Sequence, residues 1–233
     1  MKLNLDCISK SYSRKQVLKK INFTFESGNI YGLIGRNGVG KTTLFECLSG
    51  SKKSDSGAAY IDINNNKRLI SPFDVGYMSS VPILPEFLTG QEFLDFIKDA
   101  NEHVKCSVDE YFDMVKIEKG LRTDLIKNYS HGTKNKIQML SLIISKPAII
   151  LLDEPFTSLD IVVALEIKEF LRNIKKDHII IFSTHILQLA LDLCNELVIL
   201  NDGTLERLDP LLLKDINFEN KILEILRGGD TFI

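Results

Sequence analysis

The stretch YGLIGRNGVGKTTLFECLSG, residues Tyr31 to Gly50, holds five glycines and one lysine between an apolar run and a helix-like segment. The apolar run NIYGLIG is typical of a buried β-strand, and Thr42 to Ser49 is predicted to form a helix. Between them, Gly35 to Thr42 matches the pattern G-x-x-x-x-G-K-[ST], which requires a strand before it and a helix after it. The stretch therefore predicts a phosphate-binding loop.

The residue types in this loop fit the chemistry of a triphosphate. Glycines let consecutive backbone N–H groups point inward, and the helix adds the positive end of its dipole. Lys41 supplies a charge for the β- and γ-phosphates, and the Thr42 hydroxyl suits Mg²⁺. The loop predicts a nucleoside triphosphate with Mg²⁺, but it does not separate a kinase, GTPase, helicase or transport ATPase. The other loop residues expected at the nucleotide are Arg36, Asn37, Gly38, Val39, Gly40 and Thr43.

Two carboxylates follow a second apolar strand. In IILLDEPFTSLD, Ile149 to Asp160, four apolar residues place Asp153 at the carboxyl end of the strand, where ligands bind in open α/β sheets. Asp153 is expected to hold the magnesium hydration shell, and Glu154 is expected to polarise the attacking water as a general base. The alternative is a buried strand with an acidic exit loop, which the glycine loop disfavours.

The next apolar strand, HIIIFSTH, ends at His185. A lone histidine is more often a capping or core residue. Its placement level with Asp153 nevertheless favours a contact with the γ-phosphate.

The remaining pattern predicts an α/β chain with a helical insertion. Leu3, Leu5 and Cys7 alternate with polar residues, as expected of a half-buried strand, and so does a second segment around Phe23. Residues 82–145 show helical spacing instead. The chain has 233 residues, a net charge of −2 and four scattered cysteines without a CxxC pair. These features disfavour nucleic acid as the main partner and a zinc site. Because the longest apolar runs are too short to span a bilayer, any membrane role is expected to depend on a partner.

These motifs, in this order, resemble the ATP-binding subunit of ABC transporters from about Leu3 to Glu206. Gly35 to Thr42 resembles the Walker A loop of that family, and Ile149 to Glu154 resembles Walker B with its catalytic glutamate. The resemblance also implies a D-loop that includes Asp160 and a switch role for His185. Tyr12 matches the aromatic residue that stacks on adenine, although a plain surface tyrosine is the alternative.

The segment YSHGTKNKIQML, which starts at Tyr129, falls where the family has its LSGGQ signature. Ser130 matches the signature serine and Gly132 its second glycine, whereas His131 and Thr133 depart from the pattern. The resemblance implies that Ser130, Gly132 and Asp160 of one subunit contact ATP held by a second nucleotide-binding subunit, either a second copy or a close relative. A simple helix cap is the alternative for this segment.

A further departure lies after VGYM, where the family carries a glutamine or glutamate that reaches Mg²⁺. Here Ser79 or Ser80 takes that place, and Ser80 is favoured by the spacing. A serine requires a bridging water to make the same contact. Slower hydrolysis or altered coupling is therefore expected.

The resemblance implies a complete architecture. We expect an α/β P-loop NTPase fold with a RecA-like core, a mixed sheet, an antiparallel β subdomain and an inserted helical subdomain. The nucleotide-binding domain is expected over residues 1–210, with the helical subdomain at about 82–146 and a short tail at 211–233. The resemblance implies ATP and Mg²⁺ as its ligands. It also implies integral membrane permease subunits on a separate chain as partners, which would place it at the cytoplasmic face of the cell membrane.

The function implied is ATP hydrolysis coupled to transport. The segment LPEFLTGQEFLDF and the short signature look more like bacterial export systems than importers. The alternatives are a soluble ABC ATPase of repair, translation or cluster assembly, and a P-loop kinase or GTPase. Residues 96–124 leave no room for the long coiled coils of repair ATPases. Glu154 directly after Asp153, together with His185 and Ser130, argues against a kinase or GTPase.

Overall fold

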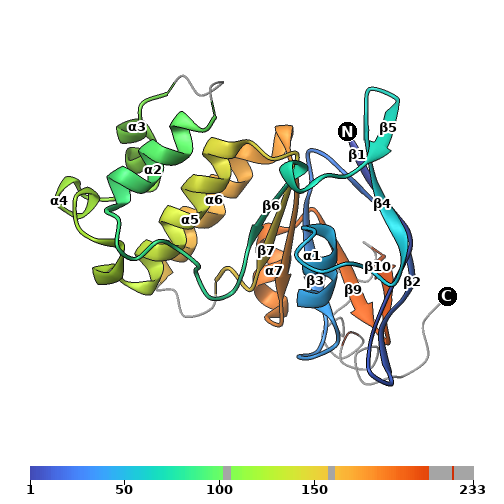
Figure 1. Cartoon of the computed structure of the whole chain (residues 1–233). Helices are drawn as coiled ribbons and strands as arrows, with labels where there is room; N and C mark the ends of the chain where they lie inside the picture. Colours follow the sequence, from blue (N-terminus) through green and yellow to red (C-terminus); the bar gives the residue numbers. More distant parts are fainter. Residues whose placement is uncertain (102–105, 157–160, 210–221, 223–233) are drawn as a thin grey trace.

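The computed structural model describes residues 1–101, 106–156, 161–209 and 222. Two β-sheets lie side by side, and a group of helices lies on the far side of the larger sheet (Figure 1). This arrangement is the mixed α/β architecture with an antiparallel sheet and a helical part that the sequence predicts.

The larger sheet has six strands in the order β10-β9-β3-β8-β7-β6. All neighbouring pairs are parallel except β10 with β9. Every residue of β3, β7 and β8 is buried, as expected for central strands covered on both faces. The carboxyl ends of five strands therefore meet at one edge. The bounds are β3 Ile30–Ile34, β6 Val75–Met78, β7 Ile149–Asp153, β8 Ile179–Thr184, β9 Glu196–Asn201 and β10 Thr204–Arg207.

The smaller sheet is antiparallel, in the order β2-β1-β4-β5. Its strands are β1 Lys2–Tyr12, β2 Lys15–Glu26, β4 Ser56–Ile63 and β5 Asn66–Leu69. Leu3 and Leu5 are buried as predicted, but the predicted alternation is wrong at Cys7, which is exposed. The pairing register shifts between Leu5 and Ile8, and Cys7 has a φ of 51°. This bulge inserts residues that the period-two pattern does not anticipate.

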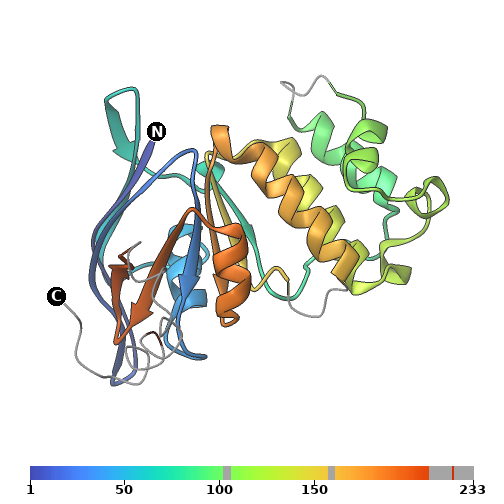
Figure 2. The same ribbon diagram turned by 180° about the vertical axis from the view of Figure 1, so that it is seen from behind.

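Helix α1 (Lys41–Leu48) lies between the two sheets, where Leu44, Phe45 and Leu48 join a core with both of them. Helices α6 (Ile161–Ile174) and α7 (Leu187–Leu193) pack against the opposite face of the larger sheet (Figure 2). The sheet edge at the start of α1 is thus held between two separate apolar cores.

The predicted helical insertion is confirmed in the described residues. It contains α2 (Gly90–Asp99), α3 (Val108–Met114), α4 (Lys119–Arg122) and α5 (His131–Ser145). Thr89 and Glu92 form a capping box at the start of α2. Helix α5 ends at Lys146 in the left-handed conformation, directly before Pro147. No helix in the described ranges is both long and apolar enough to cross a membrane.

Candidate active site

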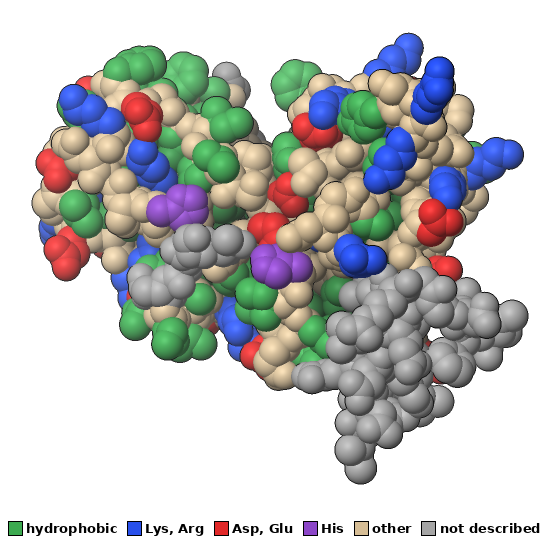
Figure 3. All heavy atoms as spheres, turned by 90° about the horizontal axis from the view of Figure 1, so that it is seen from below, with side chains coloured by type: hydrophobic (Ala, Val, Ile, Leu, Met, Phe, Trp, Pro, Cys, Tyr) green, Lys and Arg blue, Asp and Glu red, His purple; other side chains and the backbone are tan. Residues whose placement is uncertain are grey.

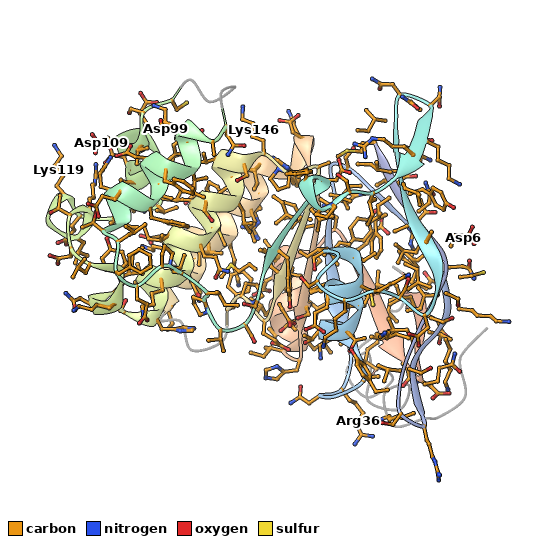
Figure 4. The ribbon with its side chains drawn as sticks, in the orientation of Figure 1. Asp6, Arg36, Asp99, Asp109, Lys119 and Lys146 are labelled. Atoms are coloured by element: carbon orange, nitrogen blue, oxygen red, sulfur yellow. The ribbon has the colours of Figure 1, made fainter. Side chains whose placement is uncertain are left out.

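The glycine loop leaves β3 and leads into α1 at the shared edge of the larger sheet. Gly38 and Gly40 have φ values of 77° and 120°, which side chains disfavour, and a Cβ at Gly40 would lie 2.6 Å from Cγ1 of Val17. The close turn therefore requires glycine at these two positions. Arg36 lies at the tip of the loop and points away from the body of the protein (Figure 4).

Lys41 is buried beneath this loop, with only 6% of its surface exposed. Its Nζ donates to the carbonyl oxygens of Gly35 at 2.7 Å and Arg36 at 3.4 Å. Nζ also lies 3.9 Å from Oε1 of Glu154. Burial lowers the pKa of the Lys41 amine, and the carboxylates of Glu154 and Asp153 oppose that shift. A buried amine in this position is poised to neutralise an anion in the loop.

Asp153 links the loop to the neighbouring strands. It is 3% exposed, and its Oδ2 accepts a hydrogen bond of 2.7 Å from the Thr42 hydroxyl. Its Oδ1 accepts one of 2.5 Å from Ser183, a fully buried residue that the strand register places opposite it. Thr42 and Asp153 therefore present a hydroxyl and a carboxylate side by side, which are hard oxygen donors of the kind that Mg²⁺ prefers.

Glu154 and His185 form the second pair of the site. Nδ1 of His185 lies 3.0 Å from Oε2 of Glu154. Glu154 has a φ of 51°, which is strained for a residue with a side chain, and its N–H donates to the Ser183 hydroxyl at 3.0 Å. The strained backbone and the serine contact hold the carboxylate toward the loop.

Lys41, Thr42, Asp153 and Glu154 line a cavity of about 440 Å³, a size that suits a small-molecule ligand. His185 is not among its lining residues and meets the site through its contact with Glu154. Viewed from below, acidic and histidine side chains lie near the middle of this face, between the helical part and the two sheets (Figure 3). The predicted site residues that line the cavity are Tyr12, Arg36, Asn37, Gly38, Gly40, Lys41, Thr42, Thr43, Ser80, Asp153 and Glu154.

Some predicted residues lie elsewhere. The Val39 side chain does not line the cavity; it packs against the core around α1, and its N–H donates to the carbonyl of Arg36 at 3.2 Å. Ser130 caps α5 by accepting from the Thr133 N–H at 3.1 Å, and Ser130 itself is exposed. The capping alternative is thus realised in this structure, while the hydroxyl stays accessible. Gly132 follows in the first turn of α5, and Asp160 lies outside the described residues.

The structure also separates the two serines after β6. The Ser79 hydroxyl donates to the carbonyl of Val81 at 2.7 Å, whereas Ser80 lines the cavity. Val17 lines it beside Tyr12. Neither Val17 nor Ser183, which holds Asp153 and Glu154, is assigned a role from the sequence. The parallel register of β7 and β8 places Ser183 opposite Asp153 and would have predicted this contact. The register of two paired strands cannot be derived from a single sequence.

Comparison with known proteins identifies the family. The model of the ABC transporter family matches residues 18–157, which is more than half of the chain. The chain belongs to the ABC transporter ATP-binding family. It is therefore an ATP-binding subunit and an ATPase of this family.

Individual relatives of this ABC ATPase agree. The ABC transporter ATP-binding protein YdbJ of Bacillus subtilis, itself described as uncharacterized, is 32% identical over 96% of this chain and 74% of its own length. A solved structure described as the ATP-binding subunit of an ABC transporter has a TM-score of 0.79 at 24% identity, covering 99% of this chain and 96% of that one. The cassette MJ0796, solved as a post-hydrolysis dimer with ADP and Pi, has a TM-score of 0.74 at 21% identity, covering 89% and 99%. Both structures support the P-loop NTPase fold.

Proposed function

We propose that two copies of this chain bind two ATP molecules at a shared interface, and that ATP-driven closure and hydrolysis drive membrane subunits on a separate chain. The observation that carries this proposal is that the side chains of four residues meet at one edge of the larger sheet: Lys41, Asp153, Glu154 and His185. The exposed hydroxyl of Ser130 at the start of α5 is available to a second copy. Binding energy that favours the closed pair would move the membrane partner by linkage.

The domain division proposed for this ABC ATPase separates a part built on β-sheets from a part built of helices. Residues 1–210 form the nucleotide-binding domain, and residues 82–146 form its helical subdomain. Support comes from the two sheets, which share one core around α1, and from α2 to α5, which follow one another in the chain. Of these helices, α2, α3 and α5 pack in a second core with the other face of the larger sheet. Residues 211–233 form a short tail, of which the structure describes only Ile222.

The adenine is proposed to stack on Tyr12, which is 40% exposed at the rim of the cavity. The amines of Lys10 and Lys52 lie 5.7 Å and 5.4 Å from the centre of its ring. Both amines are paired with carboxylates, Lys10 with Asp55 at 2.8 Å and Lys52 with Glu46 at 2.7 Å. The loop from Arg36 to Thr43 then cradles the phosphates with backbone N–H groups, and Lys41 neutralises them.

Magnesium is proposed to sit against Thr42 and Asp153, with Ser80 contributing through a water. The donor set fits this ion, because Mg²⁺ uses few protein ligands and keeps several waters beside substrate phosphates. When bound, it would neutralise the charge that develops on the phosphates. The chain's own part is to hold Asp153 from two sides through the hydroxyls of Thr42 and Ser183.

Glu154 is proposed as the general base that takes a proton from the attacking water. His185 orients it through the 3.0 Å contact and reaches toward the γ-phosphate. Asp153 is proposed to bind the metal, while Glu154 accepts the proton. Adjacent carboxylates thus take two different roles, because one points to the Thr42 hydroxyl and the other to His185.

The cross-dimer contact is proposed to use Ser130 and Gly132, together with Asp160. The start of α5 offers backbone N–H groups and a hydroxyl to a phosphate held by the other copy. The start of α6 supports an interface nearby, since Ile161 and Val162 are 79% and 64% exposed. Exposed apolar side chains of this kind are typical of surfaces that a partner covers.

The membrane partner is proposed to dock on the segment after β6. Val81, Ile83 and Phe87 are each more than 70% exposed there, at 71%, 79% and 78%. Docking at this surface would hold the ATPase at the cytoplasmic face of the cell membrane. The sequence of this segment and the short signature favour export as the direction.

The experiment is capture from detergent-solubilised membranes of the source cells with a tagged chain. We expect an integral membrane protein to be retained by the wild type and lost with Phe87→Asp or Ile83→Asp. Leu69→Asp is the matched control, because Leu69 is 59% exposed on the far antiparallel sheet. Recovery of ribosomes or nucleic acid instead, or equal retention by every variant, would contradict the proposal.

A further inference from the structure

Gln138 lies in the middle of α5, and its side chain is a buried amide whose oxygen lacks a hydrogen-bond donor among the described residues. Its exposed fraction is 8%, and the atom without a partner is Oε1. Buried polar atoms without a partner are rare and cost stability, so such an atom points to a ligand or to a water. The apolar neighbours of Gln138 on the helix, Ile137 and Met139, belong to the core in the ordinary way.

The side chain lies at the metal side of the candidate site. Gln138 lines a second cavity of about 470 Å³ together with Thr42, Ser80 and Asp153. The same three residues also line the cavity assigned to the nucleotide, so the two cavities adjoin at the proposed metal position. The Gln138 amide on α5 therefore lines the same cavity as Asp153 on β7 and Thr42 on α1.

The chemistry of that space requires acceptors. A magnesium ion held by few protein groups keeps several waters, and each bound water is a strong hydrogen-bond donor. Both oxygens of Asp153 already accept from side-chain hydroxyls. The Ser79 hydroxyl already donates a hydrogen bond to the carbonyl of Val81, and the side chain of Ser80 is too short to reach the metal directly. Oε1 of Gln138 is a fully buried acceptor at this cavity, and it has no donor among the described residues.

We propose that Oε1 of Gln138 accepts a hydrogen bond from a water of the magnesium ion at Thr42 and Asp153, and so positions the metal for hydrolysis. Gln138 is a positioning residue in this scheme and does not touch the phosphates. The inference rests on the metal site in the proposed function. The inference also accounts for the buried amide, which destabilises the fold while its oxygen lacks a donor. A water on the bound metal would donate to that oxygen and offset the loss.

The test uses Gln138→Met, which keeps the volume and removes the amide, in a Glu154→Gln background that slows hydrolysis. Mn²⁺ is the probe, and its affinity for the ATP-bound protein is measured by electron paramagnetic resonance. We expect the Mn²⁺ affinity to fall by about tenfold, as for other groups that orient a metal's ligands. ATP affinity in EDTA should stay within about twofold, and the melting temperature without nucleotide should stay equal or rise. Gln138→Glu, which keeps an acceptor, should retain or tighten Mn²⁺ binding.

Asn135→Leu is the matched control. Asn135 also has a buried carbonyl oxygen without a partner among the described residues, at 2% exposure, but it lines neither cavity. It should leave Mn²⁺ affinity unchanged. Equal Mn²⁺ affinity in Gln138→Met and its parent, or an equal loss of ATP affinity in EDTA, would overturn the inference. If the parent with Gln138 intact binds no Mn²⁺ with ATP, the proposed metal site itself fails.

Discussion

The hydroxyl of Ser183 donates a 2.5 Å hydrogen bond to Oδ1 of Asp153, and Oγ of Ser183 accepts a hydrogen bond of 3.0 Å from the N–H of Glu154. One fully buried hydroxyl therefore holds both neighbouring acidic residues. It fixes the carboxylate of Asp153 and the strained backbone of Glu154 at the same time.

Ser183→Ala is expected to lower both stability and activity. The change leaves the partly buried N–H of Glu154 without its acceptor, which costs about 1–3 kcal/mol of the free energy of unfolding. It also frees Asp153 and Glu154, so the turnover number should fall more than about tenfold. Chemical denaturation and ATPase assays check the two effects.

Thr184→Val is the control for Ser183→Ala. Its hydroxyl is also buried and accepts from the Ile186 N–H at 3.0 Å, but it contacts neither carboxylate. We expect a similar loss of stability with turnover within about twofold of wild type. An equal drop in turnover for both variants would mean that Ser183 acts only through the fold.

His185→Ala tests the partner of the proposed base. Removal of the imidazole should lower the turnover number by about a hundredfold, in the range for acid–base groups, with ATP affinity nearly unchanged. His178→Gln is the control, because His178 precedes the other end of β8 and its Nδ1 lies 2.6 Å from the Pro147 carbonyl. A His185→Ala variant that retains wild-type turnover would remove His185 from the mechanism.

Ser80→Gln tests the departure after β6. A longer amide at this position could reach the metal directly, so we expect basal ATP turnover to rise several-fold. Ser79→Gln should give no gain, since the Ser79 hydroxyl is engaged with Val81 and does not line the nucleotide cavity. A steady-state rate that is unchanged or lower in Ser80→Gln would show that the serine is not the limiting feature.

Asp74→Asn tests a pH effect on stability away from the site. Arg68 donates two hydrogen bonds of 2.6 Å to Asp74 and lowers the pKa of that carboxyl from 3.8 to about 2. Because the pKa in the folded state lies below that of the unfolded state, the pair stabilises the protein above about pH 4, and this gain is lost as the pH falls toward 2. The variant should melt roughly 2–4 °C lower at neutral pH.

The deficit of Asp74→Asn should shrink in acid and vanish near pH 2. Asp6→Asn is the control, because Asp6 is an exposed carboxylate that points outward from β1 (Figure 4). A deficit that stays constant between pH 7 and 3 would assign the effect to packing instead of charge.

Much of the sheet and of the site could be predicted because the chemistry is local in the sequence. The glycine loop and the acidic pair each lie within a few residues of one apolar strand, and both strands form as predicted. The prediction for Cys7 failed because a bulge breaks the alternation of β1. A period-two pattern carries no information on extra residues in a strand.

The rest of the site depends on three-dimensional register. Ser183 meets Asp153 only because β7 and β8 are paired in one parallel register. Gln138 reaches the same space from α5, far from either strand in sequence. Contacts between elements that are far apart in the chain produce no periodic pattern in a single sequence. A role at the site could therefore not be assigned to Ser183 or Gln138 from the sequence.

The measurement that tests the shared-interface model most directly is light scattering after gel filtration of the Glu154→Gln variant with ATP and Mg²⁺. Loss of the proposed base should leave nucleotide binding intact and trap the closed pair, so the variant should elute with twice the monomer mass of 26.4 kDa. Without nucleotide, or with Ser130→Arg added, it should elute as a monomer. A monomer in saturating ATP and Mg²⁺, with nucleotide bound, would contradict the model.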